Sequence, residues 1–170
     1  MKFKITVLAI ALASLSGSVW AGAGPPAQNA TATFQVTASV SATCVISATN
    51  VAFGAITPAA TGTATTTGTI TSTCTKTTPY TLALNAGGGT IAARTMAGGT
   101  AGNTDKLAYN IYTDAGATLI FGDGTAGNGS TVGLTGTGAA QTTTIYGQSS
   151  LNQYVKPDAY SDNLTVTMTY

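Results

Sequence analysis

Two cysteines, Cys44 and Cys74, are the residues best suited to form a covalent bond with each other. The chain contains no histidine, which excludes a Ser–His–Asp triad and a Cys–His nucleophile and leaves too few ligands for a metal site. In an exported protein, an even number of cysteines favours a disulfide. We therefore predict a Cys44–Cys74 bond, whose closed loop contributes roughly 3–4 kcal/mol of stability in the chain-entropy description.

The carboxylates are the second group that could do chemistry, and there are five of them: Asp105, Asp114, Asp123, Asp158 and Asp162. General acid–base catalysis needs two carboxyl groups that converge in a cleft. These aspartates sit mainly at predicted strand ends and turns, where Asp ordinarily binds backbone amides. Asp123 and Asn128 miss the spacing of a calcium loop, and the glycines of 122–129 lack the lysine and helix of a phosphate loop. The sequence predicts no catalytic residue, metal, cofactor or small-molecule substrate.

Residues 1–21 predict a secretory signal peptide. Lys2 and Lys4 precede an apolar run at 5–15, and Val19-Trp20-Ala21 is a small-x-small cleavage site. The run is too short to span a bilayer, and a retained N-terminal anchor is the alternative. Two of the six basic residues leave with this peptide, against five acidic residues that remain. The nearly neutral mature chain is therefore not expected to bind nucleic acid.

Residues 31–44 carry the clearest periodicity in the chain. Polar side chains alternate with five apolar ones, which are Ala32, Phe34, Val36, Ala38 and Val40. This period of two predicts a strand with one buried face. The preceding residues, 22–30, contain Pro25-Pro26 and no periodicity, as is typical of a flexible leader.

The rest of the chain predicts an all-β fold. Charged residues make up only 6% of it, glutamate is absent, and threonine is abundant, which favours strands over helices. We expect a connection at 94–106, a long loop or irregular edge strand at 122–140, and strands at 45–54, 65–75, 79–86, 107–114, 118–121, 142–147 and 162–170. Short strands separated by turns indicate an immunoglobulin-like β-sandwich over residues 43–170.

This predicted sandwich lacks one strand. Six substantial strands and a short one follow Cys44 and none follows Tyr170, whereas an immunoglobulin-like sandwich has a seventh principal strand beside the sixth. The last strand, with apolar positions Leu164, Val166, Met168 and Tyr170, should therefore have an open edge that accepts a strand from another chain. Within residues 22–42, the spare strand at 32–40 would serve as that donor. We predict an incomplete sandwich that is completed by the donor strand of a neighbouring subunit.

A set of short motifs follows in order along residues 32–170: Cys44 before Phe53-Gly54, Cys74 before Pro79-Tyr80, Arg94-Thr95-Met96, YNIYTD at 109–114, FGDG at 121–124, Tyr146-Gly147, and YSDNLTVTMTY at 160–170. In this combination the chain resembles the spore coat protein U family, whose members include subunits of archaic, Csu-type chaperone–usher pili. The family often has Trp where Phe121 stands and Gly where Asp158 stands.

The resemblance implies a function and partners. The subunit would fold in the periplasm on a chaperone that lends a strand to the open groove. An outer-membrane usher would then exchange that strand for the donor strand of another copy or of a related pilin. The product would be a cell-surface pilus that serves adhesion and biofilm formation.

Three other functions remain open at this point. A secreted spore-coat or matrix-like protein would fold residues 32–40 back into its own sandwich. A sugar-binding module would use exposed aromatic rings, for which the candidates are Tyr109, Tyr112, Tyr146, Tyr160 and Tyr170. An enzyme is the third, and the residue types above argue against it.

Overall fold

The computed structural model describes residues 22, 24 and 27–170, so the predicted signal peptide lies outside the described residues. The chain forms two units, with the boundary between Ala38 and Ser39. The described residues form strands and no helix, and therefore contain no helix long and apolar enough to cross a membrane.

In the first unit, the described residues form no regular secondary structure. Residues 27–42 include no strand, although their alternation predicts one. The side chains of Phe34 and Val36 are 88% and 82% exposed, and Val40, just past the unit boundary, is 87% exposed. The physical reason is that a strand needs a neighbour to bond its backbone groups and to cover its apolar face.

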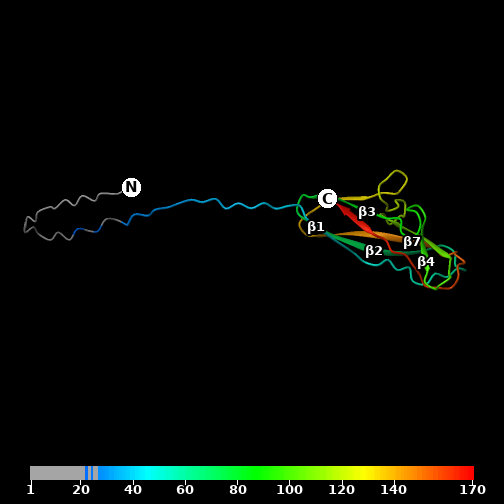
Figure 1. The fold of residues 1–170 in the computed structure, drawn as a ribbon. Coiled ribbons are helices and arrows are strands. Elements are labelled where there is room, and N and C mark those ends of the chain that lie inside the picture. Colours follow the sequence, from blue (N-terminus) through cyan, green and yellow to red (C-terminus); the bar gives the residue numbers. More distant parts are fainter. Residues whose placement is uncertain (1–21, 23, 25–26) are drawn as a thin grey trace, which may run out of the picture. The chain divides into compact units, whose positions relative to one another are not determined.

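The second unit is a β-sandwich of two antiparallel sheets (Figure 1). The larger sheet has the order β1-β2-β7-β5-β4-β8, and the smaller has the order β6-β3-β9. The strands are β1 (Cys44–Ala48), β2 (Thr63–Cys74), β3 (Pro79–Leu84), β4 (Arg94–Gly98), β5 (Lys106–Tyr112), β6 (Val132–Thr135), β7 (Ala140–Ser150), β8 (Tyr160–Ser161) and β9 (Val166–Thr169). The fold is an incomplete immunoglobulin-like sandwich, as the sequence predicts.

Several predicted boundaries are wrong. The expected connection at 94–106 contains β4, whose sequence RTMAG has one large apolar residue and no visible alternation. The expected strand at 45–54 ends at Ala48, and the expected short strand at 118–121 is reduced to isolated bridges. In each case pairing to a neighbouring strand, which sequence pattern does not report, decides where the strand lies.

The buried core lies between the sheets. Along β2, every second residue from Gly68 to Cys74 is buried, and these face Tyr80, Leu82 and Leu84 of β3. Ser72 is also fully buried, and its hydroxyl lies 2.7 Å from the hydroxyl of Tyr80. Satisfying both hydroxyls internally lets these polar groups remain in an apolar core.

Candidate functional site

A groove of about 1080 Å³ opens between the two sheets. Its lining is mostly apolar and comes from both layers. From the larger sheet come Ile70, Leu107, Tyr109, Ile111 and Ile145, and from the smaller sheet and the residues around it come Leu84, Leu164 and Val166. An apolar groove of this size is better suited to bind the apolar side chains of an extended segment than to hold a catalytic centre.

One wall of the groove is the edge strand β9. It pairs with β3 over Val166–Thr169, and among the described residues it has no second neighbour in its sheet. Its free backbone groups are thus available to a further strand.

The other wall is a segment that the sequence interpretation assigned to a strand, residues 49–56. Thr49 still bonds to β2, since its amide donates to the carbonyl of Thr69 at 2.9 Å, and the residues after it belong to no strand. Val51 lies over two glycines, because a Cβ at Gly68 or Gly147 would sit 2.7 or 2.8 Å from its methyl groups. These glycines let the wall approach the sheet closely.

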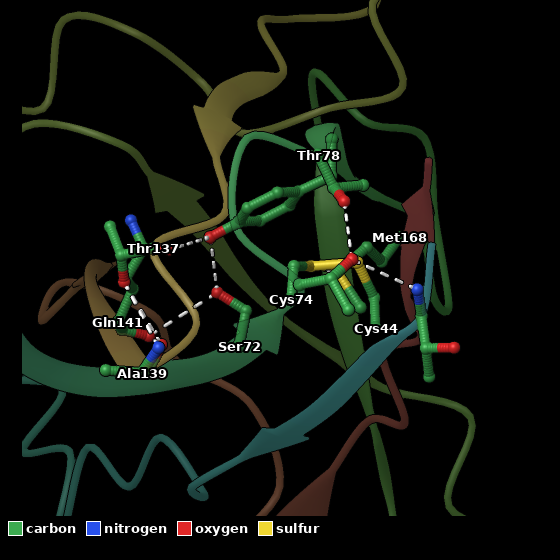
Figure 2. Close-up of a disulfide and its surroundings, with 11 residues drawn as sticks. Cys44, Ser72, Cys74, Thr78, Thr137, Ala139, Gln141 and Met168 are labelled. Atoms are coloured by element: carbon green, nitrogen blue, oxygen red, sulfur yellow. Dashed lines mark hydrogen bonds between the residues drawn. A yellow bond between two sulfur atoms is a disulfide. The ribbon is translucent and has the colours of Figure 1, made fainter. Parts of the chain in front are cut away.

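The structure divides the predicted acceptor residues into two pairs. Leu164 and Val166 line the groove and are partly buried. Met168 lies beside the disulfide instead, with its sulfur 3.9 Å from Sγ of Cys74 (Figure 2). Tyr170 follows the end of β9 and is 58% exposed. Residues 49–56 and 153–163 also line the groove, and the sequence pattern predicts neither as part of an acceptor site.

Cys44 and Cys74 are joined by a disulfide that links β1 to β2 at directly paired positions (Figure 2). Cys74 is buried, and Ser72 and Thr78 lie close by in the same view. The bond fixes β1 on the edge of its sheet, and the groove wall at 49–56 continues from that strand.

The sequence pattern does not predict a buried polar cluster around Arg94. Arg94 is fully buried, and its guanidinium donates to the carbonyls of Asn85 and Phe121, both at 2.7 Å, and to Oδ1 of Asn110 at 2.6 Å. Burial lowers the pKa of Arg94. A charge at this depth is tolerated because its donors meet acceptors directly.

Tyr109 and Asp162 form a hydrogen-bonded pair within the groove lining. The hydroxyl of Tyr109 donates to Oδ2 of Asp162 at 2.5 Å, and the amide of Gly88 donates to the same carboxylate at 3.0 Å. Burial, followed by the hydrogen bond to Asp162, raises the pKa of Tyr109 well above its usual value. The ring of Phe53 meets that of Tyr109 edge to face, with centroids 6.0 Å apart.

Of the remaining carboxylates, Asp114 and Asp123 bind their own turns, whereas Asp105 and Asp158 bind segments distant in the sequence. Hydrogen bonds lower the pKa of three of them, chiefly from the Leu119 amide to Asp114, from the Thr125 side chain to Asp123 and from the Asn103 side chain to Asp158. Asp105 accepts a bond from the amide of Lys156. Within residues 22, 24 and 27–170, no three acidic or cysteine side chains gather into a metal-binding group.

An open strand edge, an apolar groove and an exposed alternating segment thus define a class of incomplete β-sandwich. The Spore Coat Protein U domain model matches residues 30–167, and the chain belongs to that family. The family resemblance predicted from the motifs is thereby confirmed.

The fold also matches a solved structure. It is similar to a chain in the crystal structure of the CsuC–CsuE chaperone–tip adhesion subunit pre-assembly complex from archaic chaperone–usher Csu pili of Acinetobacter baumannii. The TM-score is 0.56 and the sequence identity 19%, over 77% of this chain and 40% of that chain. This chain therefore spans less than half of its structural neighbour. A comparison with curated proteins found no match.

Proposed function

We propose that the chain is a structural subunit of an extracellular pilus that assembles by donor-strand exchange. The observation that carries the proposal is that one sequence contains both an incomplete sandwich and an unpaired strand segment. The groove lacks a strand along β9, and the donor segment, defined as residues 32–40, has exposed apolar side chains and no strand partner. When the donor segment of one copy lies in the groove of the next, it supplies the missing strand, and its apolar side chains become buried.

The gain in free energy from such an exchange is large. Burying Phe34, Val36 and Val40 at roughly 1.5–3 kcal/mol each gives about 5–9 kcal/mol, an upper bound because unfolded chains are already partly compact. Ala32 and Ala38 would fill narrower places. Backbone bonds to β9 on one side and to residues 49–56 on the other would add a smaller net amount each.

Partners and location follow from the family and the structural neighbour. A periplasmic chaperone would lend a strand to the groove before assembly, and this is supported by the chaperone–subunit complex in which the similar fold occurs. An outer-membrane usher would exchange that strand for the donor segment. Residues 1–21 would be the export signal, residues 22–42 the leader and donor strand, and residues 43–170 the sandwich. The fibre would serve adhesion and biofilm formation.

The second candidate is a secreted spore-coat or matrix-like protein that does not exchange strands. The family name itself supports this alternative. In that protein, residues 32–40 would complete their own sandwich, and the donor side chains would be buried in the monomer. Residues 27–42 form no strand in the single chain, which favours the pilus subunit.

The test is a pair of neighbouring substitutions in the donor segment. Val36→Asp leaves the unassembled chain folded, because Val36 is 82% exposed there, but buries an unpaired charge once the segment enters a groove, at a cost of several kcal/mol. Thr37→Asp is the matched control, since the next side chain points to the opposite face. Unheated samples of the purified mature chain are compared on detergent gels, and exporting cells by electron microscopy.

We expect a detergent-resistant ladder and fibres from the wild-type chain and Thr37→Asp, and monomer alone from Val36→Asp. A normal ladder from Val36→Asp would show that this side chain enters no groove. A wild-type chain that stays monomeric at every concentration would favour the coat protein.

A further inference from the structure

A polar cluster that extends into the groove lining has no part in strand exchange as described above. It consists of Arg94, Tyr109, Asn110 and Asp162. Its members belong to separate sequence motifs, RTM, YNIYTD and YSDNLTVTMTY, which the structure brings together. Every buried side-chain nitrogen and oxygen among the described residues has a hydrogen-bond partner. The two hydrogen-bonded pairs, Arg94–Asn110 and Tyr109–Asp162, fix distances between the elements they join.

Arg94 and Asn110 connect one sheet to the other. Both residues belong to the larger sheet, in β4 and β5. Nε and Nη2 of Arg94 donate at 3.1 and 2.7 Å to the carbonyl of Asn85, the residue directly after β3 of the smaller sheet. Asn110 in turn donates to the carbonyls of Ile91 and Ala92 in the connection between the sheets. The guanidinium thus links the larger sheet to the residue that follows β3 of the smaller sheet.

Tyr109 connects both walls of the groove. Its hydroxyl binds Asp162, which precedes β9, and its ring contacts Phe53 in the opposite wall. The turn after β3 is shaped around the same carboxylate. The amide of Gly88 donates to it, and a Cβ on Gly87, which has a φ of 62°, would collide with it.

These contacts oppose the closure of the empty groove. An apolar groove of about 1080 Å³ exposes surface that water would drive together. Without a strand between them, the two walls would gain by closing, since protein interiors tend toward close packing. Hydrogen bonds with fixed lengths and directions break if the sheets approach or slide, and broken bonds at buried groups are costly.

We propose that Arg94, Tyr109, Asn110 and Asp162 form a brace that keeps the groove open before a strand arrives, with Tyr109 as the positioning residue for both walls. The brace rests on the proposed function, because it matters only to a chain whose groove must receive a strand. These four residues belong to the empty subunit itself, so they keep its groove open to the donor segment without another chain.

The test measures strand uptake rather than folding alone. The mature chain carrying Val36→Asp, which cannot donate to a neighbour, is mixed with a fluorescently labelled peptide of residues 30–42, and the uptake rate is followed by anisotropy. Tyr109→Phe in that background removes only the hydroxyl. Tyr112→Phe removes the same group from the same strand at a position that does not line the groove.

We expect Tyr109→Phe to slow uptake roughly tenfold, as the loss of one hydrogen bond to a charged group predicts, while Tyr112→Phe takes up peptide at the parent rate. Melting temperatures are measured with and without bound peptide, and Tyr109→Phe should lower that of the empty form more than that of the filled form. Asp162→Asn, which keeps an oxygen acceptor, is a second variant and should slow uptake by a smaller factor.

The outcomes separate the brace from the function on which it rests. Equal uptake by the parent, Tyr109→Phe and Tyr112→Phe, with equal loss of stability in empty and filled forms, would overturn the brace alone. No uptake by the parent or by Tyr112→Phe would overturn strand exchange itself, and the brace with it.

Discussion

The two ends of the sandwich are made from the same strands and differ in what covers them. At the disulfide end, Ser72, Cys74, Tyr80 and Leu82 are buried between β2 and β3. Toward the other end, the same sheets diverge around a groove, and Leu164 and Val166 stay partly exposed. Alternation therefore specifies which face of a strand is apolar, and the presence or absence of a facing strand decides whether that face is buried.

The largest expected contrast is between a leucine at each end. Leu82 has no exposed surface, so Leu82→Ala should destabilise the empty chain by about 2–5 kcal/mol through lost burial and a new cavity. Leu164→Ala should cost only about 1–2 kcal/mol, because its surroundings are already open and no closed cavity forms. Denaturant titration of the two variants measures both values.

A filled groove should remove this contrast. With the peptide of residues 30–42 bound, the cost of Leu164→Ala should rise toward that of Leu82→Ala, because the peptide closes the space around Leu164. An unchanged cost with peptide bound would mean that the peptide does not lie against β9.

The disulfide end could be predicted from the sequence, and much of the groove end could not. Alternation locates most of β2, β3, β5, β7 and β9, and two cysteines in an exported chain indicate one bond. The brace gave no such signal, because a buried arginine such as Arg94 breaks the rule that charges stay at the surface. Its acceptors are mainly backbone carbonyls, such as those of Asn85 and Phe121, which carry no side-chain identity.

The groove wall at residues 49–56 was mispredicted for a related reason. Val51 and Phe53 continue an apolar spacing that is typical of a strand, but residues 49–56 belong to no strand of the single chain. The sequence reports a preference for extended backbone, and only a partner turns that preference into a paired strand.

A smaller expected effect is a loss of folding stability at alkaline pH, which arises from Tyr109 in the groove. The pKa of Tyr109 is raised in the folded chain above its ordinary value of about 10, so the unfolded chain loses this proton first as pH rises. The stabilisation is complete below pH 10 and is lost progressively as pH rises toward the folded pKa. Denaturant titrations between pH 8 and pH 11.5 should show a steeper decline for the parent than for Tyr109→Phe. Parallel declines would mean that the hydroxyl is not held as described.

If the sandwich lacks a strand that residues 32–40 can supply, moving that strand within one chain should complete the sandwich. Residues 30–42 are copied behind Tyr170 after a short glycine–serine linker, and residues 22–40 are deleted. The copied strand is now intramolecular and needs no partner. We expect a monomer that does not polymerise and that melts at a much higher temperature than the same deletion without the copied strand. Equal melting temperatures for the two proteins would contradict this expectation, because a complete sandwich gains nothing from a further strand.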